Sequence, residues 1–175
     1  MAARSGKPVA LTLAEFNQLV SQHAVALYRL AFRMVGDPHE AEDVVQDTFR
    51  SAWKSRSRYE AARGQRAWLT MILRRRVADR WRKRPLPSTL AESETLEIGV
   101  EPPESALEPY TDEMQRALDR LPAELRDTLL LVVVGELTHQ EAANVLNVPL
   151  GTVLSRVSRA RQRLRENWLA LQKHD

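Results

Sequence analysis

Apolar residues recur every three or four positions along most of the chain, and this spacing predicts α-helices. Three such patterns occupy the first half, at residues 13–34, 41–52 and 68–81. In the second half, one pattern ends at Leu121-Pro122, a second runs over residues 125–134, and a third lies at residues 153–164. Because no β-hairpin signal or internal repeat accompanies these patterns, the sequence predicts an all-α fold.

Polar residues at the starts of the patterns support this prediction. A Thr or Asp side chain accepts a hydrogen bond from a first-turn amide, and a glutamate three residues later completes a capping box. The pairs with this spacing are Thr12 with Glu15, Asp37 with Glu40, and Thr138 with Glu141. Asn147 tolerates the left-handed conformation of a tight turn, and Pro149 suits the start of the helix that follows.

The same patterns predict the core. On the second helix the expected buried residues are Ala41, Val44, Val45, Thr48, Phe49 and Ala52. The helical spacing of the third helix runs through Trp68, Leu69, Ile72, Leu73, Val77 and Trp81. Residues 129–134 are expected to be buried in a helix, although the three valines at 132–134 alone would suggest a strand.

Residues 85–110 interrupt the helical patterns. Five of the nine prolines lie in this stretch, and residues 85–113 carry eight acidic residues and no Lys or Arg. Such a composition favours a flexible linker. The prediction is therefore two small helical domains, at residues 8–84 and 111–171, joined by an acidic, proline-containing linker at residues 85–110.

The net charge of +3 conceals strong segregation. Residues 63–84 hold nine Lys or Arg and one acid, and residues 156–165 hold five arginines and no acid. Such basic blocks can bind a polyanion. Cysteine is absent and the four histidines form no HExxH pair, so no thiolate, disulfide, metal site or cofactor is expected. We expect no signal peptide and no membrane span.

Residues 138–161 have the pattern of a helix-turn-helix, whose second helix lies in the DNA major groove. Small polar residues and arginines occupy the side of that helix away from its apolar stripe. The candidate DNA-contacting residues are Thr152, Ser155, Arg156, Arg159 and Arg163. An ordinary amphipathic helix with a solvated basic face is the alternative, but the cap, the turn and the charge together favour DNA binding.

The upstream basic block combines cations with aromatic rings. Arginines attract phosphates, and aromatic rings can stack on unpaired bases, so this composition suits single-stranded or melting DNA. The candidates are Trp53, Tyr59, Arg74, Arg75, Arg80 and Arg82. In the alternative interpretation the tryptophans are core and the arginines are solvated. That alternative is favoured for Trp68, whereas Tyr59 lies in a polar loop and is expected to be exposed.

Carboxylates gather on the second helix, at Asp43 and Asp47 beside Gln46. They form either a solvated face or a surface that binds a basic partner protein, and the spacing alone leaves both open. They do not resemble a catalytic site, because no nucleophile, phosphate loop or paired histidine accompanies them.

Together these motifs resemble the extracytoplasmic-function (ECF) group of bacterial sigma factors. The matching segments are EDVVQDTF at residues 42–49, WLTMI at 68–72, Leu-Pro at 121–122 and GTVLSR at 151–156. Their order and spacing, with the acidic linker between them, make the resemblance specific. It implies a region 2-like bundle and a region 4-like helix-turn-helix domain.

The resemblance also implies roles. Asp43, Gln46 and Asp47 match residues that contact the β′ clamp helices of core RNA polymerase, whose β subunit is a further partner. Residues 53–84 match the segment that opens the −10 promoter element, and residues 150–163 match the part that reads the −35 element. An anti-sigma protein is an expected partner, and the cytoplasm is the expected location.

Two rival functions fit parts of the pattern. A free-standing helix-turn-helix regulator would bind an operator tightly without polymerase, but it would need a dimer interface for a two-part site. An adaptor would use its N-terminal domain only to bind protein. The sequence leaves open whether the two domains pack together.

Overall fold

Seven α-helices and one 3₁₀ helix make up the part of the chain that the computed structural model describes, residues 11–60, 63–83 and 112–173. These residues contain no strand, and the all-α prediction is confirmed. The linker predicted at residues 85–110 lies outside the described residues. The elements are α1 (Leu13–Val35), α2 (Pro38–Lys54), η1 (Arg56–Arg58), α3 (Gln65–Lys83), α4 (Asp112–Asp119), α5 (Ala123–Val133), α6 (His139–Leu146) and α7 (Leu150–Gln172).

The predicted caps start the helices. Thr12 accepts a hydrogen bond from the Glu15 amide, and the Glu15 carboxylate accepts one in return from the Thr12 amide, at 2.8 Å. The Asp37 carboxylate caps α2 by accepting from the Glu40 amide at 2.8 Å. The same two-way arrangement of Thr138 and Glu141 starts α6. Because these contacts span three residues, local sequence was sufficient to predict them.

Helices α1, α2 and α3 form the first bundle. Every residue predicted to be buried on α2 is buried. Phe16 of α1 meets Phe49 of α2 edge to face, with ring centroids 6.4 Å apart. Trp68 is buried, as expected. Trp81 is 55% exposed, so the interpretation in which both tryptophans belong to the core holds for Trp68 alone.

Helices α4 to α7 form the second bundle, in which α7 packs along α4, α5 and α6. Residues 129–133 are helical rather than extended, as predicted. Their predicted burial was only partly correct. Leu129 to Leu131 are buried, but Val133 is 47% exposed because it lies on the outer side of α5.

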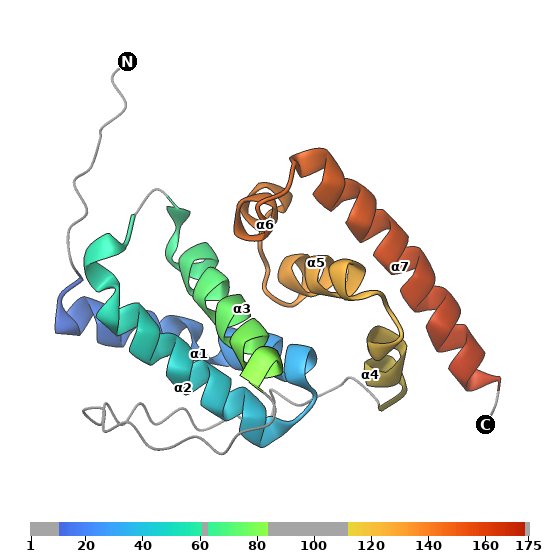
Figure 1. Ribbon diagram of the computed structural model, residues 1–175, viewed down its shortest axis with the longest axis horizontal. Coiled ribbons are helices and arrows are strands. Elements are labelled where there is room, and N and C mark those ends of the chain that lie inside the picture. The colour runs from blue at the N-terminus through green and yellow to red at the C-terminus, as the bar shows by residue number, and fades with distance from the viewer. Residues whose placement is uncertain (1–10, 61–62, 84–111, 174–175) are drawn as a thin grey trace.

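The two bundles pack against each other through α1 on α5 and α3 on α6, as Figure 1 shows. Arg33 is buried at this contact and donates a hydrogen bond to the Gln115 side chain at 3.0 Å. Gly135, two residues after the end of α5, lies against Leu30 of α1. Figure 1 places α7 on the side of α5 and α6 that faces away from the first bundle.

The close approach at Gly135 predicts a specific loss of stability. A Cβ added there would lie 2.6 Å from the Leu131 carbonyl oxygen and 3.3 Å from Leu30. We expect Gly135→Ala to lower the free energy of unfolding by about 1–3 kcal/mol. Gly151→Ala is the matched control, because its Cβ would meet nothing within 4 Å. Helix propensity should make the control neutral or stabilising, by up to about 1 kcal/mol. Urea unfolding measures both, and equal effects would contradict the packing argument.

Candidate nucleic-acid interface

The acidic residues predicted on α2 share one side of that helix. Asp43, Gln46 and Asp47 occupy positions i, i+3 and i+4, which are neighbours on a helical surface. Val44 and Val45 turn the other way, into the core. The structure therefore brings the three predicted residues together on the outside of the first bundle.

The arginines predicted on α3 do not form one patch. Arg80 reaches across to α2, where its guanidinium donates to the Asp43 carboxylate at 2.7 Å. Arg82 pairs within α3 with Asp79. Arg74 points to the second bundle, where its Nε lies 3.8 Å from a carboxylate oxygen of Asp127. Arg75 is exposed. Three of the four predicted cations thus have a carboxylate within ion-pair distance.

The two aromatic candidates differ in exposure. Trp53 is half-buried, with its ring centroid 5.0 Å from that of Phe16 and the Arg56 guanidinium 3.9 Å above it. The expected exposure of Tyr59 was wrong. Its residue is 9% exposed and its ring lies 5.0 Å from that of Trp68. The short η1 helix turns the loop back toward α3, and burial raises the pKa of the Tyr59 hydroxyl.

The helix-turn-helix is built as predicted. Asn147 adopts the left-handed conformation, with φ of 53°, between α6 and α7. Val153, Val157 and Ala160 are buried against the rest of the bundle. Pro149 precedes the first residue of α7.

The five polar candidates on α7 divide into an outer face and a flank. Ser155 and Arg159 are exposed, and Arg159 donates hydrogen bonds to the carbonyl and hydroxyl oxygens of Ser155. Thr152 is partly exposed, and Arg163 is exposed further along. Arg156 instead turns toward α5 and donates to Glu124 at 2.8 Å, which leaves its side chain 17% exposed.

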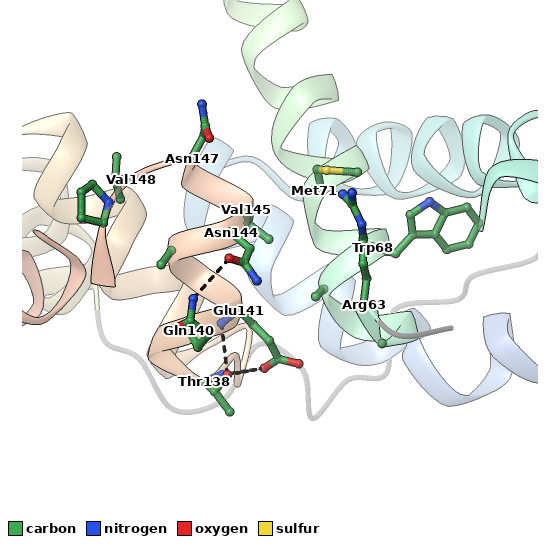
Figure 2. Close-up of a pocket in the computed structure, with 14 residues that line it drawn as sticks. Arg63, Trp68, Met71, Thr138, Gln140, Glu141, Asn144, Val145, Asn147 and Val148 are labelled. Atoms are coloured by element: carbon green, nitrogen blue, oxygen red, sulfur yellow. Dashed lines mark hydrogen bonds between the residues drawn. The ribbon is translucent and has the colours of Figure 1, made fainter. Parts of the chain in front are cut away.

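A groove separates α3 from the helix-turn-helix. Figure 2 shows Arg63, Trp68 and Met71 on one wall and residues of α6 on the other. The second wall includes Thr138, Gln140, Glu141, Asn144, Val145, Asn147 and Val148. The first wall carries one cation, Arg63, beside the apolar side chains of Trp68 and Met71, and the second wall mixes polar residues with Val145 and Val148.

Two acids of the second bundle were not among the predicted site residues. Glu136 accepts from Arg66 of α3 at 2.6 Å, and Asp127 lies near Arg74. Burial raises the pKa of the Asp127 carboxyl, while the charges of Arg74 and Arg126 act in the opposite direction. No local signal in the sequence could have revealed these pairs, since Arg66 and Glu136 are 70 positions apart.

Two further properties hold for the described residues. Within these ranges, no three His, Cys, Asp or Glu side chains gather in a way that could hold a metal ion. No helix in the same part of the chain is long and apolar enough to cross a membrane.

Known families match both bundles. Sigma-70 region 2 matches residues 19–85, and Sigma-70 region 4 matches residues 111–164. The ECF RNA polymerase sigma factor SigW of Bacillus subtilis is 30% identical, over 86% of this chain and 87% of its own length. SigE of Mycolicibacterium smegmatis, also an ECF RNA polymerase sigma factor, is 36% identical over 86% of this chain. The matched part is only 60% of the length of SigE.

A solved structure has a similar fold. The sigma factor RpoE of Bartonella quintana, crystallised in complex with the anti-sigma factor NepR, superposes with a TM-score of 0.69. It is 27% identical to this chain, and the alignment covers 89% of this chain and 97% of the other. The two bundles and the helix-turn-helix are those of a transcription initiation factor. The chain belongs to the extracytoplasmic-function group of RNA polymerase sigma factors.

Proposed function

We propose that this chain binds core RNA polymerase through Asp43, Gln46 and Asp47 and directs it to promoters with specific −35 and −10 elements. The grouping of these three side chains on one outer side of α2 is the observation that carries the proposal. The β′ clamp helices are the partner of this surface, and the β subunit provides a further contact. The location that this role requires is the cytoplasm, where the polymerase works.

The two promoter elements are divided between the bundles. Residues 8–84 form the polymerase-binding and −10-opening domain, in which Trp53, Tyr59, Arg74, Arg75, Arg80 and Arg82 contact DNA. Residues 85–110 act as the acidic linker. Residues 111–171 form the −35-binding domain, in which Thr152, Ser155, Arg156, Arg159 and Arg163 contact DNA. The chain supplies no active site in this scheme, since the polymerase performs the chemistry.

The docked bundles cannot read both elements at once. Centres named −35 and −10 are about 25 base pairs apart, which is roughly 85 Å at about 3.4 Å per pair. A compact chain of 175 residues has a radius of gyration of only about 16 Å. We therefore propose that the bundles separate on the promoter, which releases Arg66 and Arg74 from Glu136 and Asp127 for contact with DNA phosphates.

Charge reversal on α2 tests the polymerase contact. We expect Asp43→Arg with Asp47→Arg to lower promoter-specific transcript starts at least tenfold in a reaction with core polymerase and genomic fragments, because like charges repel at an interface. Mapping the starts of wild type also yields the promoter sequence. Glu166→Arg is the control for the charge change, since Glu166 is exposed on α7, away from α2. Unchanged starts from a folded double variant would reject this surface.

A reversible cross-link tests the separation. The chain has no cysteine, so Arg63→Cys with Gln140→Cys introduces a unique pair on the opposite walls of the groove. A bismaleimide with a disulfide in its spacer should hold the bundles together and abolish promoter opening. Reduction of the spacer should restore it. The Arg63→Cys single variant, treated identically, controls for the adduct. Full activity of the cross-linked protein would show that separation is unnecessary.

We further propose an anti-sigma protein as the regulator. The support is the fold shared with RpoE of Bartonella quintana, whose structure was solved with NepR, and the groove whose walls include Met71, Val145 and Val148. An amphipathic segment could occupy this groove and hold the factor inactive. Co-expression with the products of neighbouring genes should give a one-to-one complex that blocks transcription. Purification that never yields such a complex would count against this regulator.

A further inference from the structure

Near the start of α7 stands an exposed apolar side chain that contact of DNA with arginines and hydroxyls does not explain. Leu154 is 48% exposed. Gly151, Ser155 and Ser158, all exposed, adjoin it on the helix. No acidic residue occurs from Leu150 to Arg165, and Glu166 is the first on α7. Single exposed leucines are common on protein surfaces, so exposure alone does not indicate a function for Leu154. Its position on the helix and its neighbours are more informative.

The neighbours of Leu154 leave it prominent on this face. An added Cβ at Gly151 would meet nothing within 4 Å, so the helix surface is open there. The Ser155 hydroxyl donates to the Thr152 carbonyl at 3.0 Å, and the Arg159 guanidinium folds back onto Ser155. These polar groups are therefore engaged with their own helix, while Leu154 remains exposed one turn after the helix begins.

The other exposed leucine near the start of α7 has a different position. Leu150 precedes Val153 by three residues and Val157 by seven, and this spacing places it at the edge of the buried stripe. Leu154 lies further round the helix, next to Ser155 and one turn before Ser158. Of these two leucines, Leu154 therefore lies further from the buried stripe.

The chemistry of this face selects a partner for the leucine. Arg159, Arg161 and Arg165 surround the outer face with positive charge, which suits phosphates. Among base edges in the major groove, the one apolar group is the C5 methyl of thymine. Residues near the N-terminal end of a recognition helix are those that reach base edges.

We propose that Leu154 is a specificity-determining residue that contacts the 5-methyl group of a thymine in the −35 element. The inference rests on the proposed function, in which α7 lies in the major groove. It adds an apolar contact to the five polar candidates, and it predicts that one A·T pair of the element is read through its methyl group.

Deoxyuridine provides a direct test, because it lacks only the 5-methyl group of thymidine and keeps the same pairing edge. Each thymine of the mapped −35 element, on both strands, is replaced singly, and the affinity of the holoenzyme for the promoter is measured. We expect one replacement to weaken wild-type binding about three- to fivefold, the effect of losing one buried methyl group. Leu154→Ala should bind the unmodified promoter more weakly and should not distinguish thymine from uracil at that position.

Leu169→Ala is the matched control, because Leu169 is 45% exposed near the other end of α7. This variant should still distinguish thymine from uracil. The proposal is overturned if wild type is insensitive at every position, if Leu154→Ala remains as sensitive as wild type, or if the element contains no A·T pair. A Leu154→Ala variant that impairs holoenzyme assembly but keeps the discrimination would identify a protein contact and also overturn it. A promoter whose scrambled −35 element binds equally well would instead reject the proposed role of α7, and this inference with it.

Discussion

The packing of the two bundles against each other determines which charged side chains of this protein stay exposed. Gly135 allows the end of α5 to approach Leu30, and α6 lies along α3. A buried leucine contributes about 1.5–3 kcal/mol, whereas an exposed ion pair contributes about 0–1 kcal/mol. Apolar contact therefore sets the orientation, and the pair of Arg66 with Glu136 follows from it. As a result the positive charge of α3 is partly neutralised by acids of the second bundle, while the outer face of α7 remains exposed to solvent.

This asymmetry fits the different tasks proposed for the two domains. Reading a duplex requires an exposed helix face, and α7 has one in the docked arrangement. Opening a duplex exposes unpaired bases, and premature contact of arginines with nucleic acid would be non-specific. In the proposed scheme, the acids near Arg66 and Arg74 reduce such contact until the bundles separate. Because these pairs are only partly buried, the energetic barrier that they add is small and reversible.

Local signals made most of the fold predictable from the sequence. The capping boxes at Thr12 and Thr138 and the left-handed turn at Asn147 depend on residues within a few positions of each other. Helical spacing also identified the six core residues of α2. The candidate site was predictable to the extent that it lies on single helices, as the shared side of Asp43, Gln46 and Asp47 illustrates. The roles assigned to those residues remain predictions.

Long-range contacts account for what the sequence did not reveal. Tyr59 sits in a polar loop, but the loop returns to Trp68 and buries it. Trp81 continues the apolar spacing of α3 and is nevertheless exposed. The neutralisation of Arg74 and Arg66 depends on how two separate bundles dock. The burial of Tyr59, the exposure of Trp81 and the pairing of these arginines could not be predicted from a few neighbouring residues.

The bond between Arg80 and Asp43 joins a residue proposed to contact DNA to one proposed to contact polymerase. If the proposed contacts of DNA with Arg80 and of polymerase with Asp43 each require this bond to break, whichever ligand binds second finds it already broken. Thermodynamic linkage then requires positive cooperativity, by which each ligand raises the affinity for the other by the same factor. The two side chains are 37% and 60% exposed, so this coupling is worth at most about 1 kcal/mol, or roughly fivefold. Under the proposed contacts, a single exposed hydrogen bond would thereby give the factor a modest preference for DNA in the presence of polymerase.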